Sequence, residues 1–185
     1  MIKQMNLTET EIKDCYIIEW DEFMDDRGVF TVPFNVDDFN RQTNLDFKIV
    51  QENESMSIKN VVRGLHFQKQ PYEQAKLVRC TTGEVTDVIV DMRNDSPTYG
   101  NVVKVKLKGL STRSVFVPRG CAHGFSTQTE AIFNYKVDNQ YNKESEGGVL
   151  YNDPQLNIDW EVGQEPIISE KDLLLPFFKD LDIYS

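Results

Sequence analysis

Hydrophobic and polar residues alternate in short runs along the middle of the chain. Between Val102 and Lys108, the side chains of Val103, Val105 and Leu107 fall on one side, and three lysines fall on the other. A period of two residues predicts a strand with one buried face and one solvated face.

Further strands are predicted over residues 84–91, 114–117 and 131–137, which are rich in Val, Ile or aromatic residues. Turn-forming pairs and clusters such as Thr82-Gly83 and Ser96-Pro97 separate these runs. Short strands at intervals of about 8–12 residues, with Gly and Pro between them, favour an all-β sandwich or jelly roll.

Helical signals are few. Asn35 is a candidate N-cap for a short turn that includes Phe39. Near the C-terminus, Ser169 and Asp172 have the spacing of a capping box, and Pro176 ends that element within about one turn. We therefore expect mostly β structure with one or two short C-terminal helices.

The length and charge of the chain limit the classes of protein to which it can belong. The chain has 185 residues, which predicts a single domain over 1–185. A net charge of −10 disfavours nucleic acid and anionic membranes as partners, so binding of an anion would need a local cluster of cations. We find no run of about 18 apolar residues and no apolar secretory segment at Met1, so we expect a cytoplasmic protein.

The three cysteines, Cys15, Cys80 and Cys121, are far apart and predict reduced, buried thiols. Cys121 lies two residues before His123, on the same face of a strand, and such a pair can act as nucleophile and base. The sequence shows no third orienting group, and Cys121 fits equally well as a small core residue.

Both histidines of the chain follow an Arg-Gly pair. His66 ends the run Arg-Gly-Leu-His that begins at Arg63, and His123 follows the Arg-Gly pair at Arg119. Histidine suits proton transfer near neutral pH, although two partly buried structural histidines are the alternative. Two histidines with carboxylates could also bind a metal, but the His-x-His pair typical of metal-binding jelly rolls is absent.

Several motifs between about residues 14 and 172 resemble those of one family. They are Val61-Val62-Arg63-Gly64-Leu65-His66-Phe67-Gln68, Gln74-Ala75-Lys76-Leu77-Val78-Arg79, Ser96-Pro97-Thr98-Tyr99-Gly100, Pro118-Arg119-Gly120, Ala122-His123-Gly124-Phe125, Tyr135-Lys136-Val137 and Ile158-Asp159-Trp160. In this order and spacing, the chain resembles the dTDP-4-dehydrorhamnose 3,5-epimerases, which are RmlC-type cupins.

The resemblance implies a cupin jelly roll, or double-stranded β-helix, that acts without cofactor or metal. The implied substrate is a nucleotide-linked 4-keto-6-deoxyhexose, and the implied reaction converts dTDP-4-dehydro-6-deoxy-D-glucose to dTDP-4-dehydro-L-rhamnose through an enolate. A homodimer in which an N-terminal strand crosses to the partner is also implied.

Other functions remain open at this point. The chain could invert only C3 or only C5, and it could act on a dTDP-, CDP- or GDP-sugar. A non-catalytic jelly roll that binds a sugar nucleotide, and a metal-dependent cupin oxygenase or isomerase, are the alternatives from other classes.

The resemblance also assigns roles to residues. His66 corresponds to the base, Asp172 to its carboxylate partner, Tyr135 to the acid and Lys76 to the cation beside the enolate oxygen. The implied substrate-binding residues are Arg27, Gln51, Asn53, Arg63, His123, Tyr141, Glu146 and Lys171. One departure is Val32, which stands where the family usually has Glu.

Overall fold

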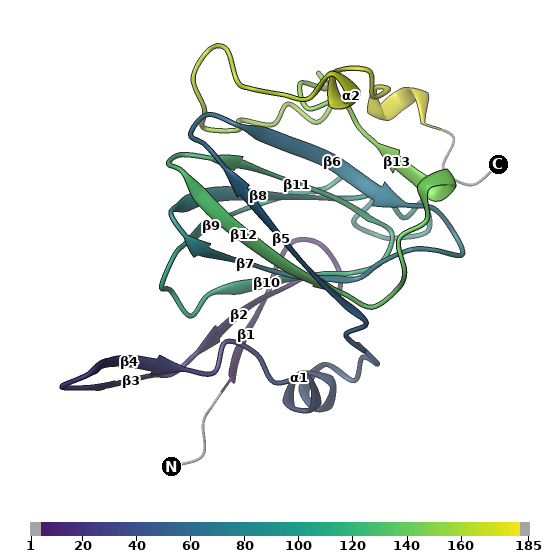
Figure 1. Cartoon of the computed structure of the whole chain (residues 1–185). Helices are drawn as coiled ribbons and strands as arrows, with labels where there is room; N and C mark the ends of the chain where they lie inside the picture. The colour runs from purple at the N-terminus through teal and green to yellow at the C-terminus, as the bar shows by residue number, and fades with distance from the viewer. Residues whose placement is uncertain (1–4, 182–185) are drawn as a thin grey trace.

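Two antiparallel sheets face each other and form a jelly roll (Figure 1). The computed structural model describes residues 5–181. In this part of the chain, the larger sheet has the order β1 (Met5–Glu9), β2 (Tyr16–Trp20), β10 (Ser114–Val117), β7 (Lys76–Thr82), β12 (Ala131–Val137) and β5 (Gln51–Ser57). The smaller sheet has the order β13 (Glu146–Gly148), β6 (Val62–Gln68), β11 (Cys121–Thr127), β8 (Glu84–Asp91) and β9 (Val102–Lys108).

A separate hairpin of β3 (Glu22–Asp25) and β4 (Gly28–Thr31) projects from the body of the jelly roll (Figure 1). The helical elements are α1 (Val36–Thr43), η1 (Lys143–Ser145), α2 (Glu170–Leu173) and η2 (Phe178–Asp180). The predicted all-β jelly roll with short C-terminal helices is thus confirmed, and the four strands predicted from the sequence have the predicted bounds.

Successive residues of a strand point to opposite faces, and both faces of the inner strands are covered. On β11, Cys121 and Phe125 belong to the core between the sheets, whereas Ala122 belongs to a second core outside the smaller sheet. On β8, Ile89 faces the inner core and Val88 the outer one. This double burial explains why β8 is an almost continuous apolar run.

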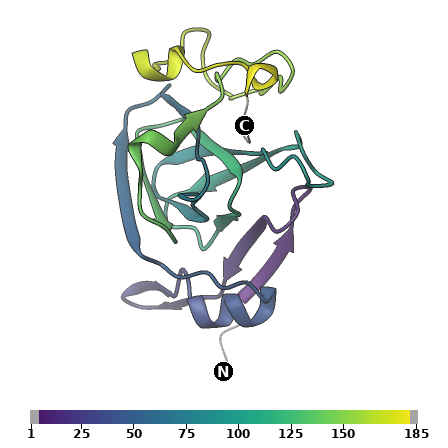
Figure 2. The same cartoon turned by 90° about the vertical axis from the view of Figure 1, so that its right-hand side faces the viewer.

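The C-terminal segment covers the outer face of the smaller sheet, at the opposite end of the molecule from α1 (Figure 2). Leu156, Trp160 and Phe178 pack there, and the Trp160 indole N–H donates to the carbonyl of Tyr151 at 2.7 Å. This packing holds the chain that leads into α2 against the jelly roll.

An aromatic cluster covers the outer face of the larger sheet. Phe39 of α1 is fully buried, with its ring centroid 4.7 Å from that of Phe116, and Phe47 packs against the same ring. The carboxamide oxygen of Asn35 accepts from the backbone N–H of Asp38 at 3.1 Å, so the predicted N-cap is confirmed. The helix runs for eight residues and is longer than the predicted turn.

The three cysteines are free and buried, as predicted. No helix between residues 5 and 181 is long and apolar enough to cross a membrane.

Candidate active site

A cavity of about 570 Å³ opens between the two sheets. The larger sheet contributes Lys76 and Tyr135 to its lining, the smaller sheet contributes His66 and His123, and the C-terminal segment contributes Asp172. All four residues assigned to catalysis from the sequence therefore line the same cavity.

His66 and Asp172 form a hydrogen-bonded pair although they are far apart in the sequence. The imidazole Nε2 lies 2.8 Å from Oδ1 of Asp172, and the other oxygen, Oδ2, accepts from the backbone N–H of Gly64 at 3.2 Å. Ser169 caps α2 by accepting from the backbone N–H of Asp172 at 3.1 Å, as the predicted capping box requires. The Asp172 side chain does not complete that box, because it is directed to the histidine instead.

The environment of Asp172 favours its ionised form. Burial raises the pKa of this carboxyl, but the hydrogen bond and charge of His66 and the hydrogen bonds of Gly64 and Ser169 together hold the pKa below its ordinary value. An ionised Asp172 accepts the proton on Nε2, so Nδ1 of His66 carries the free lone pair. Because the His66 side chain is 32% exposed, the ring is open to a molecule in the cavity.

Tyr135 lies on the wall of the cavity opposite His66. It belongs to β12 of the larger sheet and packs against the core between the sheets. Burial raises the pKa of its phenol above the ordinary value, and the Arg63 charge only partly opposes this shift. The phenol is therefore a proton donor at neutral pH.

Lys76 is the buried cation of the cavity. It shares the inner face of β7 with Val78 and Cys80, and it is only 8% exposed. Burial lowers the pKa of its ammonium to about 8, although the charge of Asp87 works in the opposite direction. Its Nζ donates to the backbone carbonyl of His66 at 3.5 Å.

A second histidine–carboxylate pair lies beside the first. Nε2 of His123 is 2.7 Å from Oδ1 of Asp87, and the imidazole stacks on Phe133 with a centroid distance of 5.9 Å. Our sequence analysis assigned no role to Asp87. The sequence does contain a signal for Asp87, because it is a carboxylate at an inward position within the mostly apolar run of β8.

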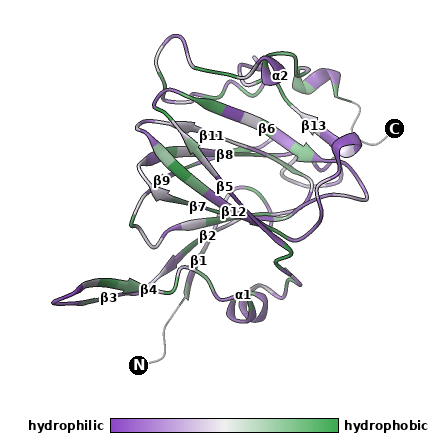
Figure 3. Ribbon diagram, in the orientation of Figure 1, coloured by the Kyte–Doolittle hydropathy of each residue, from purple (hydrophilic) through white to green (hydrophobic). Residues whose placement is uncertain are grey.

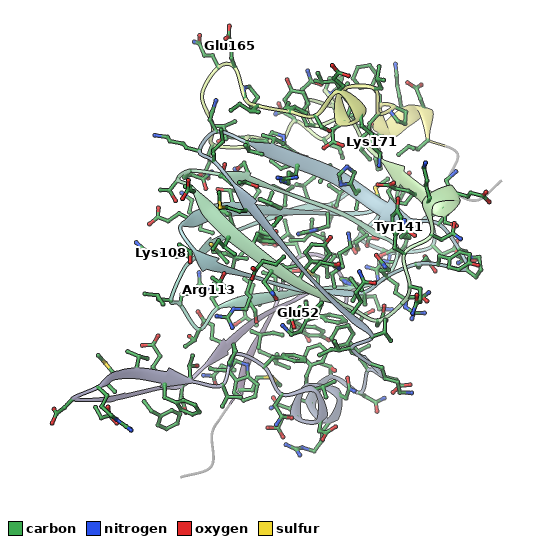
Figure 4. All side chains as sticks on the ribbon, in the orientation of Figure 1. Glu52, Lys108, Arg113, Tyr141, Glu165 and Lys171 are labelled. Atoms are coloured by element: carbon green, nitrogen blue, oxygen red, sulfur yellow. The ribbon has the colours of Figure 1, made fainter. Side chains whose placement is uncertain are left out.

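Arg63 and Lys171 are the other lining residues that the sequence analysis selected. The Arg63 guanidinium donates from Nε to Ser57 Oγ at 2.9 Å. At the rim, Oε2 of Glu146 accepts from the Lys171 ammonium at 2.6 Å and from the Tyr141 hydroxyl at 2.7 Å. Figure 4 labels Tyr141 and Lys171 at this end of the molecule, beside β13 and α2.

Three other selected residues lie apart from the lining. Gln51 and Asn53 are on the edge strand β5 and bond to each other at 2.6 Å, and Asn53 is the register partner of Tyr135. Arg27 is at the turn of the β3–β4 hairpin, where its side chain is 90% exposed and is paired with Asp25. The sequence analysis also missed Glu54, Ser55 and the apolar residues that line the cavity.

No group of three or more His, Cys, Asp or Glu residues in the 5–181 region is arranged to hold a metal ion.

A base and an acid that face each other across one cavity are suited to removing a proton from carbon and returning it on the other side. A cupin jelly roll with this pairing is typical of the sugar epimerases, which are isomerases. A family model described as dTDP-4-dehydrorhamnose 3,5-epimerase matches residues 9–180, and the chain belongs to this family.

Individual relatives agree with this assignment. The dTDP-4-dehydrorhamnose 3,5-epimerase of Shigella flexneri is 45% identical over 181 residues, which cover 97% of this chain and 99% of the relative. The crystal structure of the enzyme of that name from Elizabethkingia anophelis superposes with a TM-score of 0.93 at 48% identity, covering 97% and 99% of the two chains. The dTDP-6-deoxy-D-glucose-3,5-epimerase of Legionella pneumophila, solved in complex with dTDP-4-keto-L-rhamnose, has a TM-score of 0.92 at 40% identity, covering 97% and 95%.

Proposed function

We propose that this protein converts dTDP-4-dehydro-6-deoxy-D-glucose to dTDP-4-dehydro-L-rhamnose by inverting C3 and C5 of the hexose. The observation that carries this proposal is the imidazole–carboxylate pair of His66 and Asp172, with the Tyr135 phenol on the opposite wall of the same cavity. The family membership supplies the substrate class.

The C4 ketone of such a sugar acidifies the C–H bonds of both neighbouring carbons. Nδ1 of His66 removes the proton, and the electron pair of the C–H bond forms an enolate with its charge on the C4 oxygen. The Tyr135 hydroxyl then donates a proton to the same carbon from the other face, which inverts that centre. Exchange with solvent returns a proton to the phenolate and removes one from the imidazolium.

The negative charge on the C4 oxygen needs positive groups in a site that excludes water. Lys76 supplies a buried ammonium, and His123 supplies a second polar group held rigidly by its neighbours. Arg63 and Lys171 give the cavity further cations, which suit a diphosphate that the net charge of the whole chain would otherwise repel.

We also propose that the protein is a homodimer in which the β3–β4 hairpin contacts the partner. This hairpin stands off from the jelly roll, and parts of both of its strands have the green of hydrophobic residues in Figure 3. Met24 is 77% exposed, and Val29 is 54% exposed. Burying these side chains against a second copy would remove apolar surface from water, which favours association.

Sedimentation velocity tests the dimer. We expect the wild-type protein to sediment as a dimer. The Met24→Lys/Val29→Lys variant should already dissociate into monomers at a higher protein concentration than the wild type. Leu110→Lys is the matched control, because Leu110 is 91% exposed on a different loop. A wild-type monomer at micromolar concentration, or a variant as stable as the control, would contradict the proposed dimer.

Proton NMR of dTDP-4-keto-6-deoxyglucose in deuterium oxide tests the reaction. The wild-type protein should incorporate deuterium at C3 and C5 and give the L-rhamno product, and His66→Ala should abolish both exchanges. Exchange at one carbon only would identify a 3-epimerase or a 5-epimerase instead. Tight binding of the sugar nucleotide without any exchange would support a non-catalytic binding protein and would exclude the proposed reaction.

A further inference from the structure

Arg63 carries a positive charge that no neighbouring carboxylate balances. Its side chain lines the cavity, and within residues 5–181 its guanidinium forms no ion pair and bonds only to neutral oxygens. By contrast, five other arginines each pair with an Asp or Glu side chain: Arg27, Arg41, Arg93, Arg113 and Arg119. An unpaired guanidinium on the wall of a cavity is suited to binding an anionic ligand.

Ser57 and Met56 hold one edge of this guanidinium. Nε of Arg63 donates to Ser57 Oγ at 2.9 Å, and Nη2 donates to the backbone carbonyl of Met56 at 3.4 Å. Nη1 and the second N–H of Nη2 form the adjoining edge, and they have no partner in the described part of the chain. Two such N–H groups side by side match two oxygens of a phosphate group.

The anchor connects the two sheets. Arg63 belongs to β6 of the smaller sheet, whereas Ser57 belongs to β5 at the edge of the larger sheet. Ser57 is 4% exposed and is the register partner of Ala131 on β12, so the sheet fixes its position. Arg63 is an exposed, long side chain that would otherwise sample many rotamers. Holding its guanidinium before the ligand arrives lowers the entropic cost of binding.

We infer that Ser57 is a positioning residue for the nucleoside diphosphate: its hydroxyl holds one edge of the Arg63 guanidinium and leaves the other edge for phosphate oxygens. The inference rests on the proposed function, which supplies the nucleoside diphosphate as the ligand. Ser57 itself is not a lining residue of the cavity, so it acts through Arg63.

Isothermal titration calorimetry with dTDP measures binding apart from the reaction. Ser57→Ala removes the acceptor of Nε, so we expect the Kd for dTDP to rise by about three- to tenfold. The KM for the dTDP-sugar should rise by a similar factor, while kcat stays within about twofold of the wild-type value. Ser57→Thr keeps the hydroxyl and should bind dTDP as the wild type does.

A double-mutant cycle tests whether Ser57 acts through Arg63. Arg63→Lys keeps the positive charge but has no Nε to donate to Ser57, and its Kd for dTDP should exceed that of the wild type. Adding Ser57→Ala to Arg63→Lys should then cause no further rise in Kd. If the effects of the two substitutions are additive, Ser57 acts independently of Arg63 and the inference is overturned.

Ser114→Ala is the matched control. Ser114 lies on β10 of the same sheet, is 2% exposed and does not line the cavity. This variant should bind dTDP as the wild type does, and the same result for Ser57→Ala would overturn the inference. Absence of any exchange by a wild-type protein that binds dTDP is a different result, because it would reject the proposed reaction rather than the role of Ser57.

Discussion

His66 and His123 are opposite one another on the neighbouring strands β6 and β11, and each directs its Nε2 to a different carboxylate. Opposite residues of an antiparallel pair lie on the same face of a sheet, so the two imidazoles enter the cavity side by side. Their exposure differs, since His66 is 32% exposed and His123 is 7% exposed. The accessible ring suits a base, and the enclosed ring suits a fixed polar contact.

Asp172→Asn should lower kcat by roughly 10²- to 10⁴-fold with little change in KM, because the amide cannot hold His66 in its reactive tautomer and stabilise the imidazolium. Epimerisation assays with the dTDP-sugar measure this loss. Glu170→Gln is the control, since Glu170 is exposed on the same short helix. Equal rates for the two variants would contradict the role of Asp172.

Tyr135→Phe should separate proton removal from inversion. His66 remains able to take the proton, so deuterium should still enter the substrate, while formation of the inverted product should fall by at least about 10²-fold. One NMR time course reports both quantities. If exchange and inversion decline by the same factor, Tyr135 is not the acid.

Lys76 should produce an alkaline limit on the reaction. Because burial lowers the pKa of this lysine to about 8, its positive charge is present below that pH and is lost above it. The value of kcat/KM should therefore fall as the pH rises through about 8. Lys76→Met should reduce kcat by roughly 10²- to 10³-fold at pH 7 and should remove this limb.

Asp91 should govern part of the acid stability of the fold. Burial raises the pKa of its carboxyl, but hydrogen bonds from Arg93, Ser96 and Thr98 outweigh that effect and hold the pKa at about 2, compared with 3.8 ordinarily. A lowered carboxyl pKa stabilises the folded protein above about pH 4, and this contribution disappears as the pH falls through 2.

Urea unfolding of Asp91→Asn tests this effect. The variant should be less stable than the wild type by about 2 kcal/mol at pH 7, and the difference should shrink between pH 4 and pH 2. A difference that is independent of pH would show that packing, rather than charge, is lost.

The sequence predicted the jelly roll because period-two alternation and Gly/Pro turns are local signals. Residues 102–108 alternate so regularly that the strand bounds follow directly from them. The pairing of His66 with Asp172 could not be obtained in this way, because it depends on how the C-terminal segment folds back over the smaller sheet. Only the resemblance to a family linked these two residues before the structure was known.

Asp87 was missed for a related reason. Its position in β8 is visible in the sequence, but its hydrogen bond to His123 depends on β8 and β11 lying side by side in the smaller sheet. Arg27 is the opposite case, a residue that was selected from the sequence but does not line the cavity. The resemblance associated it with substrate binding, whereas in the structure of one chain it lies on a projecting hairpin apart from the cavity.

The base belongs to the jelly roll, but its carboxylate partner lies in a late segment. That segment is held by the packing of side chains such as Trp160 and by the backbone hydrogen bonds of Ile167 to Asn60 and Val62. Detachment of that segment alone would leave both sheets intact, but it would abolish catalysis because His66 would lose Asp172. Loss of turnover during heating should consequently precede the collapse of the β-sheet signal in circular dichroism.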